Sequence, residues 1–192
     1  MNARRPQAET PLLAWGEARH AHGLERLRRL RIAILSAAGL VLLVAPPVYG
    51  PGPRLVWNAS ASAPVGLYWV GPGDAPARGE MAIAWAPRRW RALAAERHYL
   101  PANVPLVKRV AAEHGDLVCG SGPQVSVNGV PVATRRPRDP SGRALPWWQG
   151  CRRLRPGEYL LLMDAPGSFD GRYFGISAGR DLVGRARLIW RR

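Results

Sequence analysis

The chain has 192 residues, which is enough for one folded domain with a hydrophobic core and a short additional segment. Its apolar fraction of 47% argues against general disorder, and its 19 prolines and 21 glycines favour turns and short strands over long helices. The net charge of +15 would suit a nucleic-acid partner, but the basic residues are spread along the whole chain, without a compact basic helix or zinc-ligand spacing. We therefore expect no nucleic-acid partner.

A basic segment opens the chain. Residues 1–31 are polar and end in a cluster of arginines, and no charged residue follows between Ile32 and Pro53. The apolar run from Ile32 to Ala45 is short for a membrane span of roughly 20 residues, but the residues that follow it and the snorkelling arginine side chains make it long enough. A buried core helix would show a polar face, and this run shows none beyond Ser36.

We predict that residues 32–50 form an uncleaved transmembrane anchor. The alternative is a cleaved signal peptide, but no convincing cleavage site of small residues follows the apolar run. Because arginine-rich flanks stay in the cytoplasm, residues 1–31 would be a cytoplasmic tail and residues 51–192 an exported domain. The expected location is the inner (cytoplasmic) membrane, with a single span and the catalytic domain on the periplasmic side.

After the anchor, the sequence predicts a mainly β domain of short strands broken by turns. The expected strands are residues 66–70, 81–86, 105–112, 116–119, 124–127, 130–133, 158–163 and 182–190. The fifth and sixth of these form a hairpin, because Asn128 and Gly129 between them suit a type I′ turn. A helix is expected at residues 87–98. Residues 134–148 are interpreted as a surface loop, whose Trp147 and Trp148 either pack within it or rest at the bilayer interface.

The two cysteines, Cys119 and Cys151, are too few for a zinc site without histidines, and no histidine stands at ligand spacing from either one. In an exported domain they can form one disulfide, and otherwise they would be two buried thiols. We expect the disulfide because we expect export. We expect no metal and no cofactor.

Two segments carry candidate catalytic groups. Residues 58–69 (NASASAPVGLYW) contain Ser60 and Ser62 ahead of a proline and a glycine, a composition that is also typical of a plain turn. Residues 105–116 (PLVKRVAAEHGD) contain Lys108 in an otherwise apolar strand, and it is the only lysine of the chain. Arginine keeps its proton in a protein, whereas a lysine desolvated among apolar neighbours can lose it and act as a base.

A third segment, residues 167–175 (GSFDGRYFG), contains Ser168, Asp170 and Arg172. By itself it reads as a polar turn that leads into buried aromatic side chains. In their order and wording, however, the three segments resemble the S26 family of signal peptidases. The closest resemblance is to its conjugative-transfer branch, the TraF-type peptidases that mature pilin precursors. The first segment resembles the nucleophile box, the second the general-base box and the third the final box, and the resemblance extends over residues 32–190.

The resemblance implies a signal-peptidase-like β domain behind one N-terminal transmembrane helix, and a serine endopeptidase with a serine–lysine dyad. Ser62 would be the nucleophile and Lys108 the general base. Ser60 would lend its hydroxyl to the oxyanion hole beside the backbone N–H of Ser62, and Ser168 would orient the lysine amine. Asp170 is counted among the catalytic residues.

Arg172 would support the final box together with Asp170. This chain departs from the housekeeping signal peptidases, which carry methionine after the nucleophile, because here Ala63 leads directly to Pro64. The departure favours the TraF-type branch and leaves Ser60 as the second candidate for the nucleophile.

The sequence thus predicts a membrane-anchored peptidase that cleaves an exported precursor such as a pilin propeptide. The substrate would bind along a sheet edge formed by the strand after Ser62, residues 66–70, and by residues 81–86. The alternatives are a general type I signal peptidase, a catalytically inactive assembly protein of a secretion apparatus and a self-cleaving DNA-binding repressor. The charge-free segment after residue 31 disfavours the repressor. A serine–histidine triad is disfavoured because neither His98 nor His114 stands in a suitable motif.

Overall fold

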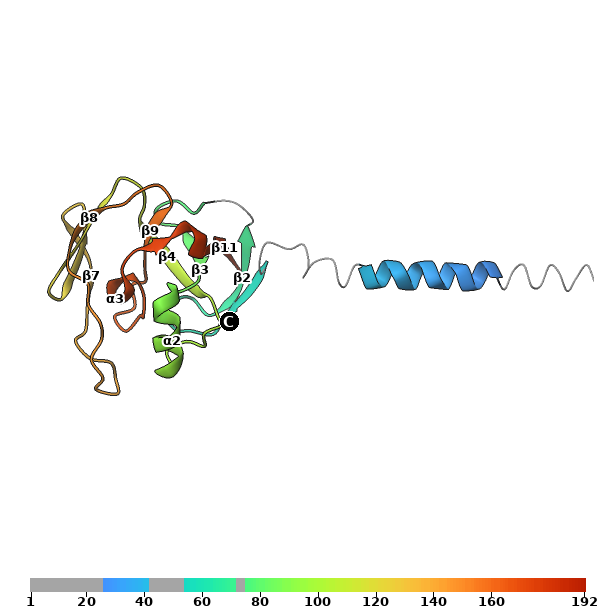
Figure 1. Ribbon diagram of the computed structural model, residues 1–192, viewed down its shortest axis with the longest axis horizontal. Coiled ribbons are helices and arrows are strands. Elements are labelled where there is room, and N and C mark those ends of the chain that lie inside the picture. The colour runs from blue at the N-terminus through green and yellow to red at the C-terminus, as the bar shows by residue number, and fades with distance from the viewer. Residues whose placement is uncertain (1–25, 42–53, 72–74) are drawn as a thin grey trace, which may run out of the picture. The chain divides into compact units, whose positions relative to one another are not determined.

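The computed structural model describes residues 26–41, 54–71 and 75–192. The chain separates into two compact units, Met1–Gly50 and Pro51–Arg192 (Figure 1).

In the first unit, residues 26–41 form a helix whose side chains are almost all exposed. Within the described part of the chain, no helix combines the length and the apolar character needed to cross a membrane. Residues 1–25 of the predicted tail and residues 42–50 of the predicted anchor lie outside the described residues.

In the second unit, seven strands form an antiparallel sheet in the order β1-β2-β11-β3-β4-β9-β10. In that order they are Leu55–Asn58, Gly66–Gly71, Leu182–Arg191, Met81–Ala84, Leu106–Ala112, Glu158–Leu162 and Ser177–Ala178. The prediction of a mainly β domain is confirmed. The predicted substrate edge at residues 66–70 and 81–86 is wrong, because both strands lie inside the sheet. β2 pairs with β1 and β11, and β3 pairs with β11 and β4.

A second, four-stranded sheet has the order β7-β6-β5-β8. Its strands are Val130–Thr134, Gln124–Val127, Leu117–Ser121 and Gly150–Arg153. The predicted hairpin joins β6 to β7, and its turn residues Asn128 and Gly129 have φ values of 51° and 83°, as a type I′ turn requires. Cys119 on β5 lies opposite Cys151 on β8, and their sulfur atoms are 2.09 Å apart in a disulfide.

Helix α2, Arg88–Glu96, confirms the predicted helix in a shorter form, while α3, Gly171–Phe174, and the 3-10 turn η1, Gly179–Asp181, were not predicted. The strands that the sequence did not predict are β1, β8 and β10. All four residues of β8 are exposed, so no apolar alternation marks it. β1 does alternate, but over only four residues.

One face of strand β4 is buried along its whole length, while Arg109 on the other face is exposed. Leu106 packs with Ala86 and Phe174, and Val110 packs with Ala82 and Leu161. Because side chains alternate along a strand, Lys108 shares the face of Leu106 and Val110 and lies between these two apolar groups. The fold therefore places the only lysine of the chain in an apolar surrounding.

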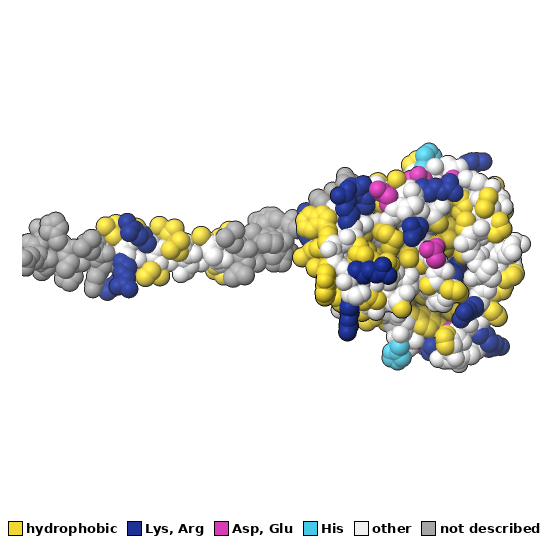
Figure 2. All heavy atoms as spheres, turned by 180° about the vertical axis from the view of Figure 1, so that it is seen from behind, with side chains coloured by type: hydrophobic (Ala, Val, Ile, Leu, Met, Phe, Trp, Pro, Cys, Tyr) yellow, Lys and Arg dark blue, Asp and Glu magenta, His cyan; other side chains and the backbone are white. Residues whose placement is uncertain are grey.

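Basic side chains on the face of the second unit seen in Figure 2 do not form one patch. On the face seen in Figure 2, Lys and Arg side chains are scattered among hydrophobic ones. The strong positive charge is therefore distributed over this face.

Candidate active site

The loop between β1 and β2 carries both candidate nucleophiles, and Asn58 at the end of β1 sets its shape. The Asn58 amide nitrogen donates hydrogen bonds to the carbonyls of Ser60 (3.0 Å), Ala63 (3.1 Å) and Pro64 (3.0 Å), and its oxygen accepts one from the backbone N–H of Ser60 (3.1 Å). The Tyr68 hydroxyl donates to the carbonyl of Pro64 (2.8 Å). The loop therefore has little freedom to move relative to the sheet.

Within this loop the two serines contact each other. The Oγ atoms of Ser60 and Ser62 are 3.0 Å apart, and the backbone N–H of Ser62 donates to Ser60 Oγ at 3.3 Å. The Ser60 hydroxyl thus lies between the hydroxyl and the backbone N–H of Ser62 and contacts both.

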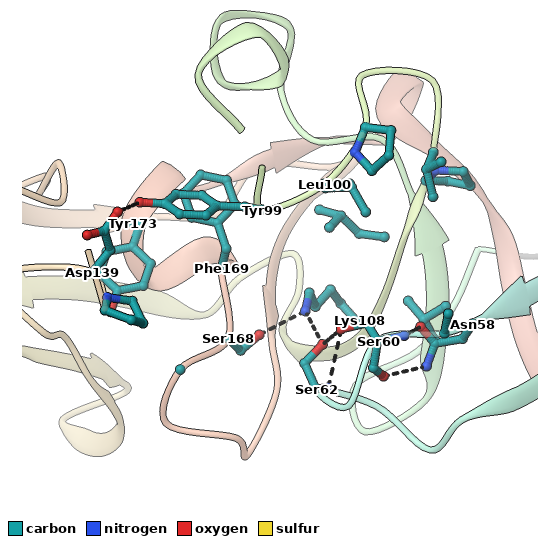
Figure 3. Close-up of a pocket in the computed structure, with 18 of the residues that line it drawn as sticks. Asn58, Ser60, Ser62, Tyr99, Leu100, Lys108, Asp139, Ser168, Phe169 and Tyr173 are labelled. Atoms are coloured by element: carbon teal, nitrogen blue, oxygen red, sulfur yellow. Dashed lines mark hydrogen bonds between the residues drawn. The ribbon is translucent and has the colours of Figure 1, made fainter. Parts of the chain in front are cut away.

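Lys108 lies between two serines that come from distant parts of the sequence. Its amine is 3.1 Å from Ser62 Oγ and 2.8 Å from Ser168 Oγ (Figure 3). The lysine is only 2% exposed. Burial lowers the pKa of the amine from 10.5 to about 8; the charge of Asp170 opposes this shift and that of Arg172 adds to it. At neutral pH about one molecule in ten therefore carries the neutral amine.

Asp170 and Arg172 form a buried ion pair that supports the loop before α3. The Asp170 carboxylate accepts hydrogen bonds from the backbone N–H groups of Met163 (3.0 Å) and Arg172 (3.1 Å), and from Arg172 Nε (2.8 Å) and Nη2 (3.1 Å). Arg172 also donates to the carbonyls of Met163 and Pro166.

The hydrogen bonds of Asp170 thus go to Met163 and Arg172, while those of the Lys108 amine go to Ser62 and Ser168. The charge of Asp170 raises the pKa of the Lys108 amine, but its hydrogen bonds stabilise the loop before α3. The predicted catalytic residue Asp170 therefore lies outside the hydrogen bonds that join Lys108 to Ser62 and Ser168.

A pocket of about 560 Å³ opens beside the dyad. Its walls combine the serine loop, the start of β4, the segment after α2, the loop before α3 and part of the loop that follows β7. The apolar wall includes Leu100, Leu106, Val107 and Phe169.

The stretch predicted as a surface loop contributes to this pocket. Asp139, almost fully buried, accepts hydrogen bonds from the Tyr99 hydroxyl and from Arg143 N (2.8 Å) and Nε (2.7 Å). Trp148 stacks against Arg135, whose guanidinium carbon is 4.5 Å from the ring centroid, and donates to the carbonyl of Gly171 (3.0 Å). Of the two tryptophans, Trp148 therefore packs within the domain.

Sequence reasoning missed Asn58, Tyr99 and Asp139. Asn58 could have been found, because it is the first residue of the serine motif and a strand-end asparagine often caps a turn. Tyr99 and Asp139 had no sequence signal, since they meet across 40 residues. The two histidines of the described second unit, His98 and His114, do not line the pocket.

The chain matches known proteins as follows. The family model described as "Signal peptidase, peptidase S26" matches residues 27–191. No curated protein matches the chain. Among solved structures, the chain is similar to a signal peptidase I of Enterococcus faecalis, at 19% sequence identity and a TM-score of 0.34, over 58% of this chain and 97% of that chain. Because the family model spans most of its length, this chain belongs to the signal peptidase family, peptidase S26, a family of serine peptidases.

Proposed function

We propose that this protein is a membrane-anchored serine endopeptidase that cleaves exported precursor proteins, with Ser62 as nucleophile and Lys108 as general base. The observation that carries the proposal is the 3.1 Å separation between the buried Lys108 amine and Ser62 Oγ. A serine hydroxyl is a poor nucleophile unless a base lies within hydrogen-bond reach, and a desolvated lysine is such a base.

The reaction would run in two steps. The neutral Lys108 amine takes the proton of Ser62 as Oγ attacks the scissile carbonyl. The resulting Lys108 ammonium then donates this proton to the leaving nitrogen of the substrate as the peptide bond breaks. Water then attacks the acyl-enzyme ester with Lys108 again as base, which releases the acid product and restores Ser62. Ser168, bonded to the amine at 2.8 Å, would hold Nζ in line during both steps.

The oxyanion formed in each step would be stabilised by the Ser62 backbone N–H and the Ser60 hydroxyl. The Ser60 hydroxyl lies 3.0 Å from Ser62 Oγ and accepts a hydrogen bond from the Ser62 N–H at 3.3 Å. Each oxyanion donor contributes on the order of 100- to 1000-fold to the rate.

A membrane location fits the apolar side chains exposed along the β1, β2 and β11 part of the sheet. They are Leu55, Trp57, Trp69, Leu188, Ile189 and Trp190. Tryptophan is favoured at the bilayer interface, and an exposed apolar surface of this kind is unusual for a protein that contacts water alone. This surface and the charge-free segment after residue 31 both favour a protein that works at the membrane.

The residues of the three motifs, 58–69, 105–116 and 167–175, favour the TraF-type branch and therefore a pilin precursor as substrate. The first test compares wild type with Ser62→Ala and Lys108→Arg in membranes that contain a conjugative pilin precursor and, separately, a secretory precursor with an ordinary signal peptide. Lys108→Arg keeps the positive charge but removes the amine that can lose its proton. We expect both variants to lose at least about 1000-fold in cleavage rate while still accumulating in the membrane.

Two neighbours serve as matched controls. Arg109 is next to Lys108 on β4 but exposed, and Ser126 lies on β6 in the other sheet. Arg109→Gln and Ser126→Ala should cleave like wild type. Normal cleavage by Lys108→Arg would show that the lysine is not the base, and absence of cleavage by wild type would favour the inactive assembly protein. Preference for the secretory precursor would favour the general signal peptidase.

A further inference from the structure

Exposed basic side chains contribute to the pocket beside Ser62 and Lys108. Arg136 and Arg138 line it together with Ser62 and Lys108. Among the described residues that line it, Asp139 is the only acidic one.

The Asp139 carboxylate already has hydrogen-bond and ion-pair partners inside the protein, namely Tyr99 and Arg143. Burial would raise the pKa of this carboxyl, but hydrogen bonds from the Tyr99 hydroxyl and from Arg143 outweigh burial and hold the pKa at about 2. The carboxylate therefore ties the loop after β7 to the segment after α2, and it is neutralised by Arg143 at 2.7 Å. It does not compensate the other two arginines.

Arg136 and Arg138 are held by their backbones while their side chains stay exposed. The Arg136 N–H donates to the Tyr173 hydroxyl (3.1 Å), and its carbonyl accepts from Trp147 Nε1 (3.4 Å). Arg138 pairs with Ala144 in an isolated β-bridge, and its Nη1 donates to the carbonyl of Gly142 (2.7 Å). In the described part of the chain, no carboxylate forms an ion pair with either guanidinium.

Two guanidinium groups that have no ion-pair partner among the described residues therefore line the same pocket as Ser62. Guanidinium binds carboxylate through two parallel hydrogen bonds, which add geometric selection to the attraction between the charges. We propose that Arg136 and Arg138 form a specificity subsite for an aspartate or glutamate side chain of the substrate, near the bond that Ser62 attacks. This inference rests on the proposed peptidase function and adds the substrate class.

The test uses the full chain in detergent micelles and alanine-based peptides that are blocked at both ends, so that a side chain supplies the only carboxylate. Each position around the centre is occupied in turn by Glu, Gln or Lys, and kcat/KM is measured for each peptide. At one position we expect kcat/KM of the Glu peptide to exceed that of the Gln peptide by about tenfold, and kcat/KM of the Lys peptide to be the lowest. A tenfold difference corresponds to one charged hydrogen-bonded pair at a partly exposed site.

Arg136→Glu with Arg138→Glu should invert the order of the Glu and Lys peptides at that position. Arg136→Gln with Arg138→Gln, a milder pair in case the reversal impairs folding, should abolish the difference. Arg180→Glu makes the same charge change at an exposed arginine of η1 outside this pocket and should keep the wild-type order.

A binding measurement separates this inference from the proposed reaction. In the Ser62→Ala background, where turnover is not needed, fluorescence polarisation should show tighter binding of the Glu peptide than of the Gln and Lys peptides, and loss of that order with the Arg136 and Arg138 changes. Equal binding of the three peptides would overturn the subsite even if wild type cleaves them. Selective binding without any cleavage by wild type would keep the subsite and overturn the peptidase function.

Discussion

At the residue scale, the chemistry of the site depends on where one amine is buried. A lysine in water keeps its proton at neutral pH and cannot act as a base. Between Leu106 and Val110 the Lys108 amine is desolvated, so its pKa falls to about 8. The lowered pKa of the amine that we propose as the base thus comes from its burial between apolar residues of β4.

This pKa predicts the pH dependence of the reaction. The neutral amine is the active form, so kcat/KM should rise about tenfold per pH unit below pH 8 and level off above it. Stability should follow the same direction. Because the folded-state pKa lies below the unfolded value of 10.5, the unfolded chain binds more protons between these values, and stability increases as the pH rises from about 8 to 10.5. Peptide cleavage measured on both sides of pH 8 tests the first effect, and a rate that falls as pH rises from neutral would contradict the assignment of Lys108 as base.

Ser168 is predicted to act by positioning the amine. Ser168→Ala removes the 2.8 Å partner of Lys108 Nζ and should lower kcat by about 100-fold, because a base displaced by about 1 Å loses that much. KM and the thermal midpoint should change little, since only one hydroxyl is lost. Ser168→Thr keeps a hydroxyl and should restore part of kcat. Equal kcat losses in the alanine and threonine variants would point to a packing role instead.

The Asp170–Arg172 pair is predicted to be a stability element. Asp170→Asn leaves the buried guanidinium of Arg172 without its charge partner and should lower the free energy of unfolding by about 3–5 kcal/mol. Urea unfolding measures this difference. The control is Asp164→Asn, because Asp164 forms an exposed pair with Arg109 at 3.7 Å that should contribute less than about 1 kcal/mol. Similar losses in both variants would contradict the buried-pair interpretation.

At the element scale, the loop after β7 links the pocket to β8 of the second sheet. Its first part lines the pocket through Arg136 and Arg138, and the chain then continues into β8 of the second sheet. β8 is exposed along its whole length, so apolar burial contributes little to holding it. The disulfide between Cys119 and Cys151 joins it to β5.

Removal of this disulfide should therefore destabilise the domain. The bond closes a loop with a sequence separation of 32, which corresponds to about 3–4 kcal/mol in the chain-entropy model. The thermal midpoint of the oxidised protein should fall on addition of a reductant, and Cys119→Ser with Cys151→Ser should show the lower midpoint with or without it. An unchanged midpoint in the double variant would show that β8 is held without the covalent link.

At the scale of the whole molecule, the sheet order brings the site together. The serine loop joins β1 to β2, Lys108 lies on β4, and Ser168 follows β9. Because β9 pairs with β4, the loop after β9 reaches the amine across 60 residues of sequence. Any change that shifts this pairing would separate the base from the group that orients it.

Membrane topology is the whole-molecule prediction. With a tag after Arg192, the second unit should be degraded by protease added to spheroplasts and protected in intact cells, because the proposed anchor leaves it on the periplasmic side. A cytoplasmic protein of known location serves as the control for lysis. Protection until the spheroplasts are lysed would place the domain in the cytoplasm and revive the self-cleaving repressor as an alternative.

The sequence by itself determined the mainly β character, most strands, the hairpin at Asn128 and the family, because alternating apolar residues, turn residues and short motifs are local signals. It also singled out Ser62 and Lys108 as a pair, since a lone lysine in an arginine-rich chain stands out before any folding is known. Only the tertiary structure decided the interior place of β3, the ion pair that takes Asp170 out of contact with the amine, and the pocket formed by the loop after β7. The physical reason is that each of these depends on contacts between residues far apart in the chain, which strand pairing and side-chain burial select together and no local pattern encodes.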